Sequence, residues 1–538
     1  MGRAITAGPP NDIYVVSDLH LGEGITESTG RYSRLETFFY DDEFARFVAR
    51  IGEASQARDV AATLILNGDI FDFLAVVRVP DSETAHALEV PMSRSERKFG
   101  LGGTESQAAW KLGVILAGHP TFLRALARHL LARPENRLVL IRGNHDAELF
   151  FPRVQEVFLA ALRDAAQAVA PDPAAVVGLD AQVEIRQWFH FEPGRVYVEH
   201  GNQYEASNAF RYVLNPVVPN EYHASRQVML DYPMGSIFVR YLYNKMKLLD
   251  PFATLFVTIE QYFRITVHHN LVDLLRTGSL HFPFFLRAIR DARLFELQGM
   301  APVRAEHERR MEELGAETGL ADKLPALERL MSRPIGTTKY RLLTEMLRPV
   351  LRTATTYVVI ALLSVLGWFL MFSVIQHKPW IAEGVFAKAS VLAILAVVSV
   401  VGLFLLFTFM NRALHNTPDP NIARCADRAE HIAALLDVPN VTMGHTHTAD
   451  LRPLRGGPAR YANSGTWIPH PGPWDIVKVR ARQFTFVRLQ GTQMDLLRWN
   501  DVHGTFEPVT LIEEYRPTAL ERLFVDPNDG GATTPEDP

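Results

Sequence analysis

Five short polar segments of the sequence combine aspartate, histidine and asparagine with glycine. They are SDLHLG (17–22), NGDIFD (67–72), RGNHD (142–146), EHGN (199–202) and MGHTH (443–447). Carboxylate, imidazole and amide oxygen groups are the protein ligands of borderline and hard divalent ions. Two such ions about 3.5 to 4 Å apart can activate a bridging water and clamp both oxygens of an in-line displacement. These residue types therefore indicate metal-assisted hydrolysis.

Each polar segment comes at the end of a predicted β-strand. The strand patterns are IYVVS (13–17), TLILN (63–67), LVLIR (138–142), RVYVEH (195–200), which follows 183–191 in a predicted hairpin, and VTM (441–443). Helical patterns separate the first three strands, and such alternation predicts an α/β sandwich. Ligands of α/β sheets bind at the carboxyl ends of strands, so we expect the five segments to converge on one crevice.

In this order, the five segments resemble the signature blocks of the calcineurin-like metallophosphoesterase family. The resemblance covers roughly residues 12–210 and 437–490. It implies a dinuclear centre with seven ligands and a metal-bridging hydroxide as nucleophile. One ion is expected on Asp18, His20, Asp69 and His447, and the other on Asp69, Asn144, His200 and His445. Manganese is the favoured metal, and iron or zinc suit the same mixed ligands.

Two further residues of the RGNHD segment are expected to act in catalysis. By the resemblance, His145 lies near the leaving-group oxygen, where it stabilises charge or donates a proton. Asp146 is expected to orient that imidazole, the alternative being a turn or cap residue. Asp72 either makes a hydrogen bond behind the ligands or caps the next helix. Arg142 either faces phosphate or pairs with a carboxylate.

A narrower similarity links DLHLG, GDIFD and GHTH to the UDP-2,3-diacylglucosamine pyrophosphatases, which cleave a pyrophosphate on a membrane-bound lipid. The sequence departs from that subgroup at two positions. His145 stands where the subgroup typically has arginine, and Asn202 stands where it typically has aspartate. The similarity therefore implies a phosphorylated substrate more firmly than it implies that particular lipid.

Two long apolar runs lie in the middle of the chain. Residues 355–375 and 389–410 carry no charge and consist mostly of aliphatic and aromatic residues. Each is about as long as a helix that crosses a bilayer, so they predict a transmembrane hairpin. The alternative is a buried pair of helices. Lys and Arg residues on both outer flanks, and the absence of a secretory signal pattern, predict that the catalytic domain faces the cytoplasm.

Composition limits the other possibilities. The 538 residues have a formal net charge of -5, so no basic excess points to a nucleic-acid polymer. The single cysteine, Cys425, excludes an intramolecular disulfide framework.

The sequence is expected to divide into four parts. They are the first part of the catalytic domain, 1–214; a helical insertion, 215–418, with the two predicted spans; the second part of the catalytic domain, 419–515; and a tail, 516–538, with a disordered end.

Three functional hypotheses follow from the sequence. The first is a membrane-tethered hydrolase of a phosphate ester or pyrophosphate, with membrane lipids as partners and a lipid-linked phosphate as one substrate class. The second is an anchored phosphodiesterase or phosphatase that acts on a soluble nucleotide. The third is a non-enzymatic membrane scaffold. A complete set of seven ligands argues against the third, because a decayed site is expected to have lost some of them.

Overall fold

The computed structural model describes most of the chain outside its middle third. The described residues are 11–26, 29–87, 92–170, 172–218, 228–244, 300–334, 420–454, 458–472, 475–480 and 483–509, with parts of 355–402. Contacts divide the chain into two compact units. The first comprises Met1–Leu255, Asn270–Ile335 and Pro420–Glu514, and the second Phe256–His269, Gly336–Asp419 and Tyr515–Pro538. All nine predicted site residues belong to the first unit.

A seven-stranded sheet with strand order β18-β17-β16-β1-β4-β5-β6 forms the centre of the first unit. Its strands are β1 (Asn11–Val16), β4 (Ala61–Asn67), β5 (Arg137–Ile141), β6 (Val183–Arg186), β16 (Thr485–Gln490), β17 (Gln493–Asn500) and β18 (Thr505–Pro508). Strands β1, β4, β5 and β6 are parallel, whereas β16, β17 and β18 add to the edge in antiparallel fashion. The three N-terminal strands agree with the predicted strand patterns.

A five-stranded sheet has the order β12-β13-β11-β8-β7. Its strands are β7 (Phe189–Glu192), β8 (Val196–Glu199), β11 (Asn440–Met443), β12 (Asp450–Pro453) and β13 (Arg460–Asn463). Strands β8 and β11 pair in parallel, with Val441 opposite Tyr197, although the whole predicted insertion 215–418 lies between them in sequence. The predicted strand 183–191 divides near Gln187, because its first half joins the seven-stranded sheet and only its second half pairs with β8.

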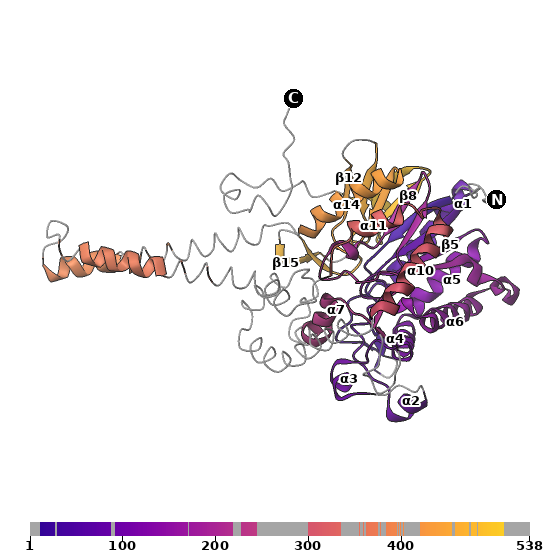
Figure 1. Cartoon of the computed structure of the whole chain (residues 1–538), viewed down its shortest axis with the longest axis horizontal. Coiled ribbons are helices and arrows are strands. Elements are labelled where there is room, and N and C mark those ends of the chain that lie inside the picture. The colour runs from indigo at the N-terminus through magenta and orange to yellow at the C-terminus, as the bar shows by residue number, and fades with distance from the viewer. Residues whose placement is uncertain are drawn as a thin grey trace. The chain divides into compact units, whose positions relative to one another are not determined.

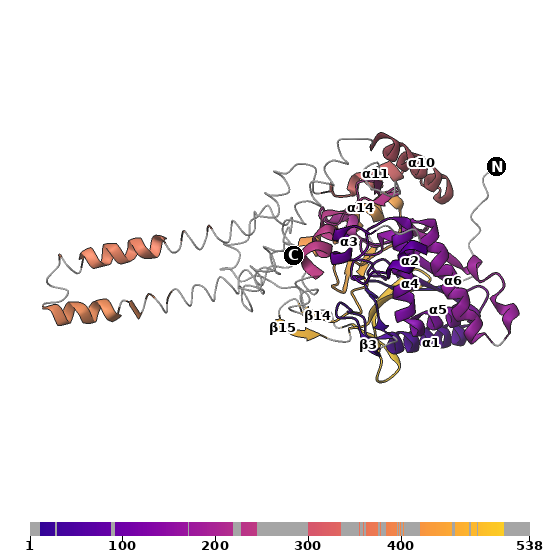
Figure 2. The ribbon, with the colours of Figure 1, turned by 90° about the horizontal axis from the view of Figure 1, so that it is seen from below.

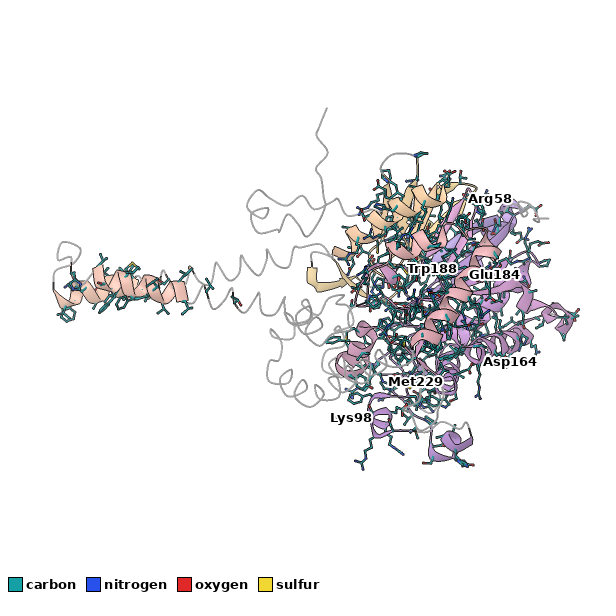
Figure 3. All side chains as sticks on the ribbon, viewed as in Figure 1. Arg58, Lys98, Asp164, Glu184, Trp188 and Met229 are labelled. Atoms are coloured by element: carbon teal, nitrogen blue, oxygen red, sulfur yellow. The ribbon has the colours of Figure 1, made fainter. Side chains whose placement is uncertain are left out.

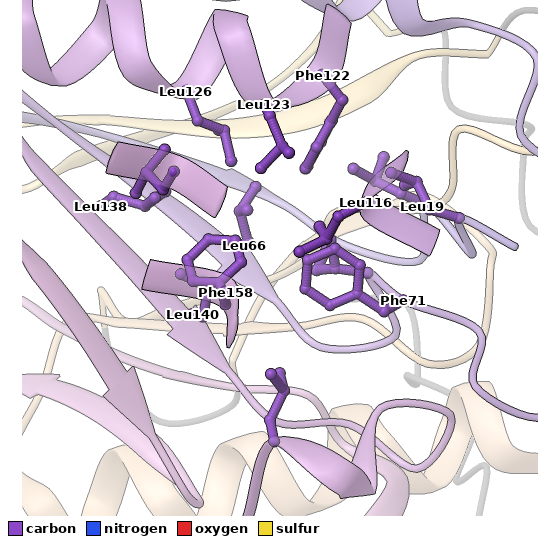
Figure 4. Close-up of a cluster of buried hydrophobic side chains, with 14 of the residues drawn as sticks. Leu19, Leu66, Phe71, Leu116, Phe122, Leu123, Leu126, Leu138, Leu140 and Phe158 are labelled. Atoms are coloured by element: carbon purple, nitrogen blue, oxygen red, sulfur yellow. The ribbon is translucent and has the colours of Figure 1, made fainter. Parts of the chain in front are cut away.

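Alternating side chains of the central strands pack against opposite faces of the seven-stranded sheet. Leu64 and Leu66 contact the core under the helices, whereas Ile65 belongs to the cluster shared with Val196 and Val198 of the second sheet. This period of two is what a strand buried on both faces requires. The outer face carries α1 (Asp41–Arg58), α4 (Glu105–Gly118), α5 (Pro120–Ala132) and α6 (Pro152–Val169). Figure 4 shows Phe122, Leu123 and Leu126 above this sheet.

A second set of helices covers the outer face of the five-stranded sheet. It consists of α10 (Met300–Thr318), α11 (Leu324–Leu330) and α14 (Pro420–Leu436). Leu324, Leu327 and Ile432 are buried in one cluster with Val441 of β11. Figure 2 shows these three helices on the side of the unit opposite α1 and α5, with the sheets between them; the same elements are labelled in Figure 1. The first unit is thus a mixed α/β structure with the layers helix, sheet, sheet and helix.

The remaining described elements are short and connect these layers. They are β2 (Ile25–Thr26), β3 (Arg31–Tyr32), α2 (Ser82–Ala87), α3 (Arg94–Phe99), η1 (Ala147–Phe150), η2 (Pro173–Val176), η3 (Leu179–Gln182), η4 (Asn202–Tyr204), β9 (Val217–Val218), β10 (Met229–Leu230), α7 (Met234–Phe238), η5 (Val239–Tyr243), β14 (His470–Gly472) and β15 (Asp475–Arg480).

The predicted transmembrane hairpin requires a correction. Within the part of the chain that the structure describes, no helix combines the length and the apolar character needed to cross a membrane. Parts of the predicted spans 355–375 and 389–410 lie outside the described residues. The predicted localisation, a multi-pass membrane protein with a cytoplasmic catalytic domain, is wrong by this finding.

A buried histidine connects two helices to the loop that follows the first polar segment. His119, between α4 and α5, lies 3.0 Å from Asp41 Oδ2 through Nδ1 and 3.4 Å from Glu36 Oε2 through Nε2. Burial lowers the pKa of His119, but the carboxylates of Asp41 and Glu36 outweigh this effect and raise it to about 9. Glu36 also accepts hydrogen bonds from the backbone N–H groups of Gly22, Gly24, Thr37 and Phe38.

The raised pKa of His119 predicts that the protein loses stability in mild alkali. The pKa is raised on folding, so its contribution is complete below the unfolded value of about 6.5 and is lost as the pH rises through about 9. We expect the Tm to fall across this range, and the fall to be smaller in His119→Asn. The control is His129→Asn, because burial lowers the pKa of His129 to about 4 and keeps it neutral over the same range. Equal slopes in wild type and His119→Asn would contradict the assignment.

Candidate metal centre

The predicted ligands lie at the carboxyl ends of adjacent parallel strands in both sheets. From the seven-stranded sheet come Asp18 and His20 after β1, Asp69 after β4 and Asn144 after β5. From the five-stranded sheet come His200 after β8, and His445 and His447 after β11. The two sheets pack face to face through one apolar cluster, which brings these strand ends together.

Side-chain atoms of six of these residues, together with one of His145, form overlapping groups whose members lie within 4.8 Å of one another. The groups are Asp18, His20 and His447; His20, Asp69 and His145; and Asp69, His200 and His445. In the first, His447 Nε2 is 3.2 Å from Asp18 Oδ1 and 3.1 Å from His20 Nε2. Ligand atoms about 2.0 to 2.2 Å from one ion are separated by roughly 3 to 3.5 Å, so this spacing is typical of metal ligands.

The carboxylate of Asp69 belongs to the second and third groups and also lies near His20 of the first. Its Oδ2 atom is 3.2 Å from His200 Nε2 and 3.9 Å from His20 Nε2. Its Oδ1 atom accepts a hydrogen bond of 2.8 Å from the backbone N–H of His145. Oδ2 is therefore the oxygen that faces both histidines, while Oδ1 is tied to the neighbouring turn. This arrangement suits a carboxylate shared by two cations.

Two observations test whether the residues fit a metal ion. The buried Oδ1 atom of Asn144 has no hydrogen-bond partner among the described residues. His200 Nδ1 donates to the carbonyl oxygen of Asn67 at 2.9 Å, which leaves the lone pair of Nε2 directed at the Asp69 carboxylate in the neutral ring. Two electron-rich atoms so close need positive charge between them. The donor set therefore fits a divalent cation on both electrostatic and geometric grounds.

The electrostatics of the two histidines agree with this arrangement. Burial lowers the pKa of His200, but Asp69 outweighs burial and raises it to about 10. The surroundings of His200 thus favour a positive charge, which a proton or a metal ion can supply. Burial, followed by the nearby His145, lowers the pKa of His20 to about 3. His20 is consequently neutral near pH 7, as a metal-ligating imidazole must be.

Backbone strain is concentrated at the same residues. Five of the seven predicted ligands have left-handed φ angles: Asp18 (54°), His20 (51°), Asp69 (53°), His445 (68°) and His447 (56°). Residues with a Cβ rarely adopt this conformation, and each instance costs on the order of 1 kcal/mol or more. The sharp turns that result direct successive polar side chains toward one place. The fold thus maintains local strain where the ligands converge.

Glycines beside the ligands make room for side chains from other strands. A Cβ atom at Gly143 would lie 2.2 Å from Asp69 Oδ1, and one at Gly68 would lie 2.4 Å from His200 Nδ1. Gly68 also has a φ of +78°, which favours glycine for a second reason. Both positions therefore require glycine because the side chain of a predicted ligand occupies the space that a Cβ would need.

The predicted partnership of His145 and Asp146 requires a correction. In the structure His145 Nδ1 lies 3.0 Å from Oδ1 of Asp72, not from Asp146. The Asp146 carboxylate instead accepts hydrogen bonds from the backbone N–H groups of Gly143 (2.6 Å) and Ile70 (2.8 Å), so it stabilises the turn. Burial lowers the pKa of His145, but Asp72 and then Asp69 outweigh it and raise the pKa to about 9. These carboxylates thus favour the protonated form of the His145 imidazole.

The hydrogen bonds of Arg142 go to backbone carbonyls and not to a carboxylate, which was one of its two expected partners. Its Nη2 atom donates to the backbone carbonyls of Gln187 (3.1 Å) and Val213 (2.5 Å), and its guanidinium carbon lies 4.8 Å from the centre of the Phe210 ring. Arg142 therefore joins the segments on either side of β7 and β8 through hydrogen bonds to backbone carbonyls.

The segment around His200 is anchored by a buried acid. Glu199 accepts a hydrogen bond of 3.1 Å from Nε1 of Trp188, which is labelled in Figure 3, and another from the hydroxyl of Tyr204. Burial raises the pKa of Glu199 to about 7. Glu199 and its partners fix the end of β8 and hence the start of the turn that carries His200.

Three residues that contact this centre lie outside the five polar segments. Glu205 Oε2 lies 2.7 Å from Nε2 of His445. Asn463 donates from Nδ2 to the carbonyl of Gly444 at 2.6 Å, and Ser464 Oγ lies 2.7 Å from Ser17 Oγ. Asn463 and Ser464 follow a strand pattern in YANSGTW, as the recognised segments do, so this position was a usable signal. Glu205 has no comparable signal, because its partner is 240 residues away.

The comparison with protein families agrees with this geometry. Residues 12–228 match the model of the family described as Calcineurin-like phosphoesterase. The chain contains a calcineurin-like phosphoesterase domain. It is therefore an enzyme of the metallophosphoesterase type, a hydrolase of phosphoester bonds, and its buried His and Asp groups are consistent with a dinuclear metal site. The predicted family resemblance is confirmed over the matched residues. No curated protein matches the sequence.

Proposed function

We propose that this phosphoesterase hydrolyses a phosphate ester or a pyrophosphate at a dinuclear metal centre in which Asp69 is shared. The observation that carries the proposal is the position of Asp69 Oδ2, 3.2 Å from His200 Nε2 and 3.9 Å from His20 Nε2. The proposed ligands of one ion are Asp18, His20, Asp69 and His447, and those of the other are Asp69, Asn144, His200 and His445. Manganese is the first metal to test, because mixed nitrogen and oxygen ligands suit it.

The protein's own residues have distinct roles in this proposal. When bound, the two ions lower the pKa of a water molecule and neutralise charge on the phosphoryl group. His145 donates from Nδ1 to Asp72, which leaves the proton on Nε2 available for the leaving-group oxygen. Asp72 fixes the orientation of that ring. The backbone N–H of His145 holds Asp69 Oδ1, so the proton donor and the shared ligand are connected.

A hydrolysis screen with Mn²⁺ tests the proposed reaction. It uses an aryl phosphate monoester, an aryl diester, a nucleotide and a pyrophosphate. The narrower similarity to UDP-2,3-diacylglucosamine pyrophosphatases motivates the pyrophosphate arm, and the second functional hypothesis motivates the nucleotide arm. We expect one class to be hydrolysed in a reaction that a chelator stops and added metal restores. Failure of all classes in protein shown to carry two ions would contradict the proposal.

His145→Ala is expected to lower kcat by roughly 10²- to 10⁴-fold, the usual contribution of a general acid. The loss should grow with the pKa of the leaving group, because poor leaving groups depend most on protonation. Metal content should stay at the wild-type level, since Nδ1 of His145 is committed to Asp72. The control is His86→Ala at an exposed position on α2. Equal losses for all leaving groups would contradict the role as proton donor.

A further inference from the structure

We propose that Glu205 is a positioning residue for His445, holding its Nε2–H so that Nδ1 is the nitrogen offered to the metal centre. This inference rests on the proposed function, because it takes His445 as a ligand. Glu205 belongs to none of the five polar segments and lies just after η4. The Glu205 carboxylate does not bind the metal ion itself; it holds the histidine that does.

The contact between Glu205 and His445 is short and shielded. Oε2 of Glu205 is 2.7 Å from Nε2 of His445, and the two side chains are 13% and 5% exposed. A carboxylate cannot donate when ionised, so the hydrogen of this bond belongs to the imidazole. Charge-assisted hydrogen bonds of this length are about twice as strong as neutral ones. The contact therefore fixes both the rotation and the protonated nitrogen of the ring.

Glu205 is itself held in place by the turn that follows it. Its other carboxylate oxygen accepts a hydrogen bond from the hydroxyl of Ser207. Its backbone carbonyl accepts from the N–H groups of Asn208 (2.9 Å) and Ala209 (2.8 Å). The carboxylate is thus anchored on its own side and aimed at the histidine.

One short segment connects the two histidines of the third group. His200 precedes η4 and Glu205 follows it, so only four residues lie between one proposed ligand and the residue that contacts another. The rings of His200 and His445 meet edge to face, with 5.3 Å between their centres. Because β8 and β11 are adjacent, the turn after β8 reaches the turn after β11. Glu205 joins the two halves of the domain at the metal centre.

The two histidines are held through opposite nitrogens. His200 donates from Nδ1 to the Asn67 carbonyl, which leaves Nε2 as its ligand atom. His445 donates from Nε2 to Glu205, which leaves Nδ1. Partners of this kind commonly change metal affinity by about 10- to 100-fold. Glu205 is not a member of the group that Asp69, His200 and His445 form among the described residues, which favours positioning over direct ligation.

The proposal makes a prediction for one ion and not for the other. His445 belongs to the group with Asp69 and His200, whereas Asp18, His20 and His447 form a separate group. Loss of Glu205 should therefore weaken one Mn²⁺ site by about 10- to 100-fold and leave the other near its wild-type affinity. In Glu205→Gln the carboxamide oxygen can still accept from Nε2–H, so most of the affinity should return.

The experiment titrates full-length protein, stripped of metal, with Mn²⁺ and follows both Kd values and the electron paramagnetic resonance of single and paired ions. It compares wild type, Glu205→Ala, Glu205→Gln and Glu192→Ala, with Tm of each metal-free protein as the check on folding. Glu192 is the matched control, because its carboxylate contacts a histidine, His190, at 3.3 Å outside the centre.

The expected result is a selective loss of the paired-ion signal in Glu205→Ala at Mn²⁺ concentrations that saturate wild type, with recovery in Glu205→Gln and no change in Glu192→Ala. Unchanged binding in Glu205→Ala would overturn the proposal. A Glu205→Gln variant as defective as Glu205→Ala would overturn it too, since it would indicate that the carboxylate is itself a ligand. Wild-type protein that binds no pair of ions would instead contradict the proposed function.

Discussion

Asp69→Asn is expected to abolish metal-dependent hydrolysis, with a loss in kcat/KM of more than about 100-fold. Substitution of a residue that only contacts a metal ligand commonly lowers metal affinity or activity by about 10- to 100-fold. Substitution of a ligand shared by both ions should therefore lower activity further. Asn keeps the shape of the side chain but removes its charge. The Oδ2 position faces His200 at 3.2 Å and His20 at 3.9 Å, so both proposed sites lose the same anion.

Metal content and rate should fall together in this variant. We expect fewer than two ions per chain after dialysis against Mn²⁺, measured by atomic emission, and a matching loss of rate. Asp180→Asn is the control, because Asp180 is a half-exposed residue paired with Arg163 on the surface. An Asp69→Asn protein with two ions and wild-type turnover would show that Asp69 is not shared.

Gly143→Ala should inactivate the enzyme although it removes no ligand atom. Its Cβ would lie 2.2 Å from Asp69 Oδ1 and 2.6 Å from the Asp69 backbone nitrogen, distances that no Cβ tolerates. Either the Asp69 side chain or the turn after β5 must move, and a shift of about 1 Å at such a centre can lower rates by roughly 100-fold. Metal titration and kcat/KM should both report this loss.

The matched control for Gly143→Ala is Gly113→Ala within α4. A Cβ at Gly113 meets nothing within 4 Å. Replacement of a helical glycine by alanine is expected to stabilise by roughly 0.5 to 1 kcal/mol. Circular dichroism and Tm establish whether Gly143→Ala remains folded. A folded Gly143→Ala protein with normal metal binding and rate would contradict the packing argument.

The central strands and the polar residues at their ends were predictable from the sequence. Leu64, Ile65 and Leu66 are all buried, and a short uninterrupted apolar run is the pattern of a strand packed on both faces. Asp69 and Asn144 follow such strands directly, and parallel strands end at the same edge of the sheet. The local sequence pattern and the general topology of parallel sheets were therefore sufficient to predict that Asp69 and Asn144 lie close together.

The partners of the site residues depended on geometry that neighbouring sequence does not contain. Asp146 is next to His145 in the chain, but its carboxylate turns back to the N–H of Gly143 in its own loop. Asp72, 73 residues away, reaches the imidazole because β4 and β5 are adjacent. Glu205 meets His445 only because β8 pairs with β11. Such contacts follow from strand pairing, which periodicity does not specify.

The insertion was the least predictable part. Long uncharged runs indicated membrane spans by composition alone, but no helix among the described residues combines the length and the apolar character that a membrane crossing needs. Part of the predicted helical insertion 215–418 belongs to the first unit, because Leu324 and Leu327 of α11 are buried with Ile432 of α14. An apolar face does not reveal which neighbour covers it, because the hydrophobic effect is not directional.

The most direct test of a shared Asp69 is a crystal structure of the Mn²⁺-loaded enzyme with anomalous scattering recorded from the metal. We predict two anomalous peaks about 3.5 to 4 Å apart, with Asp69 in contact with both, His447 at one and His200 at the other. A single peak, or two peaks of which only one contacts Asp69, would contradict the dinuclear account.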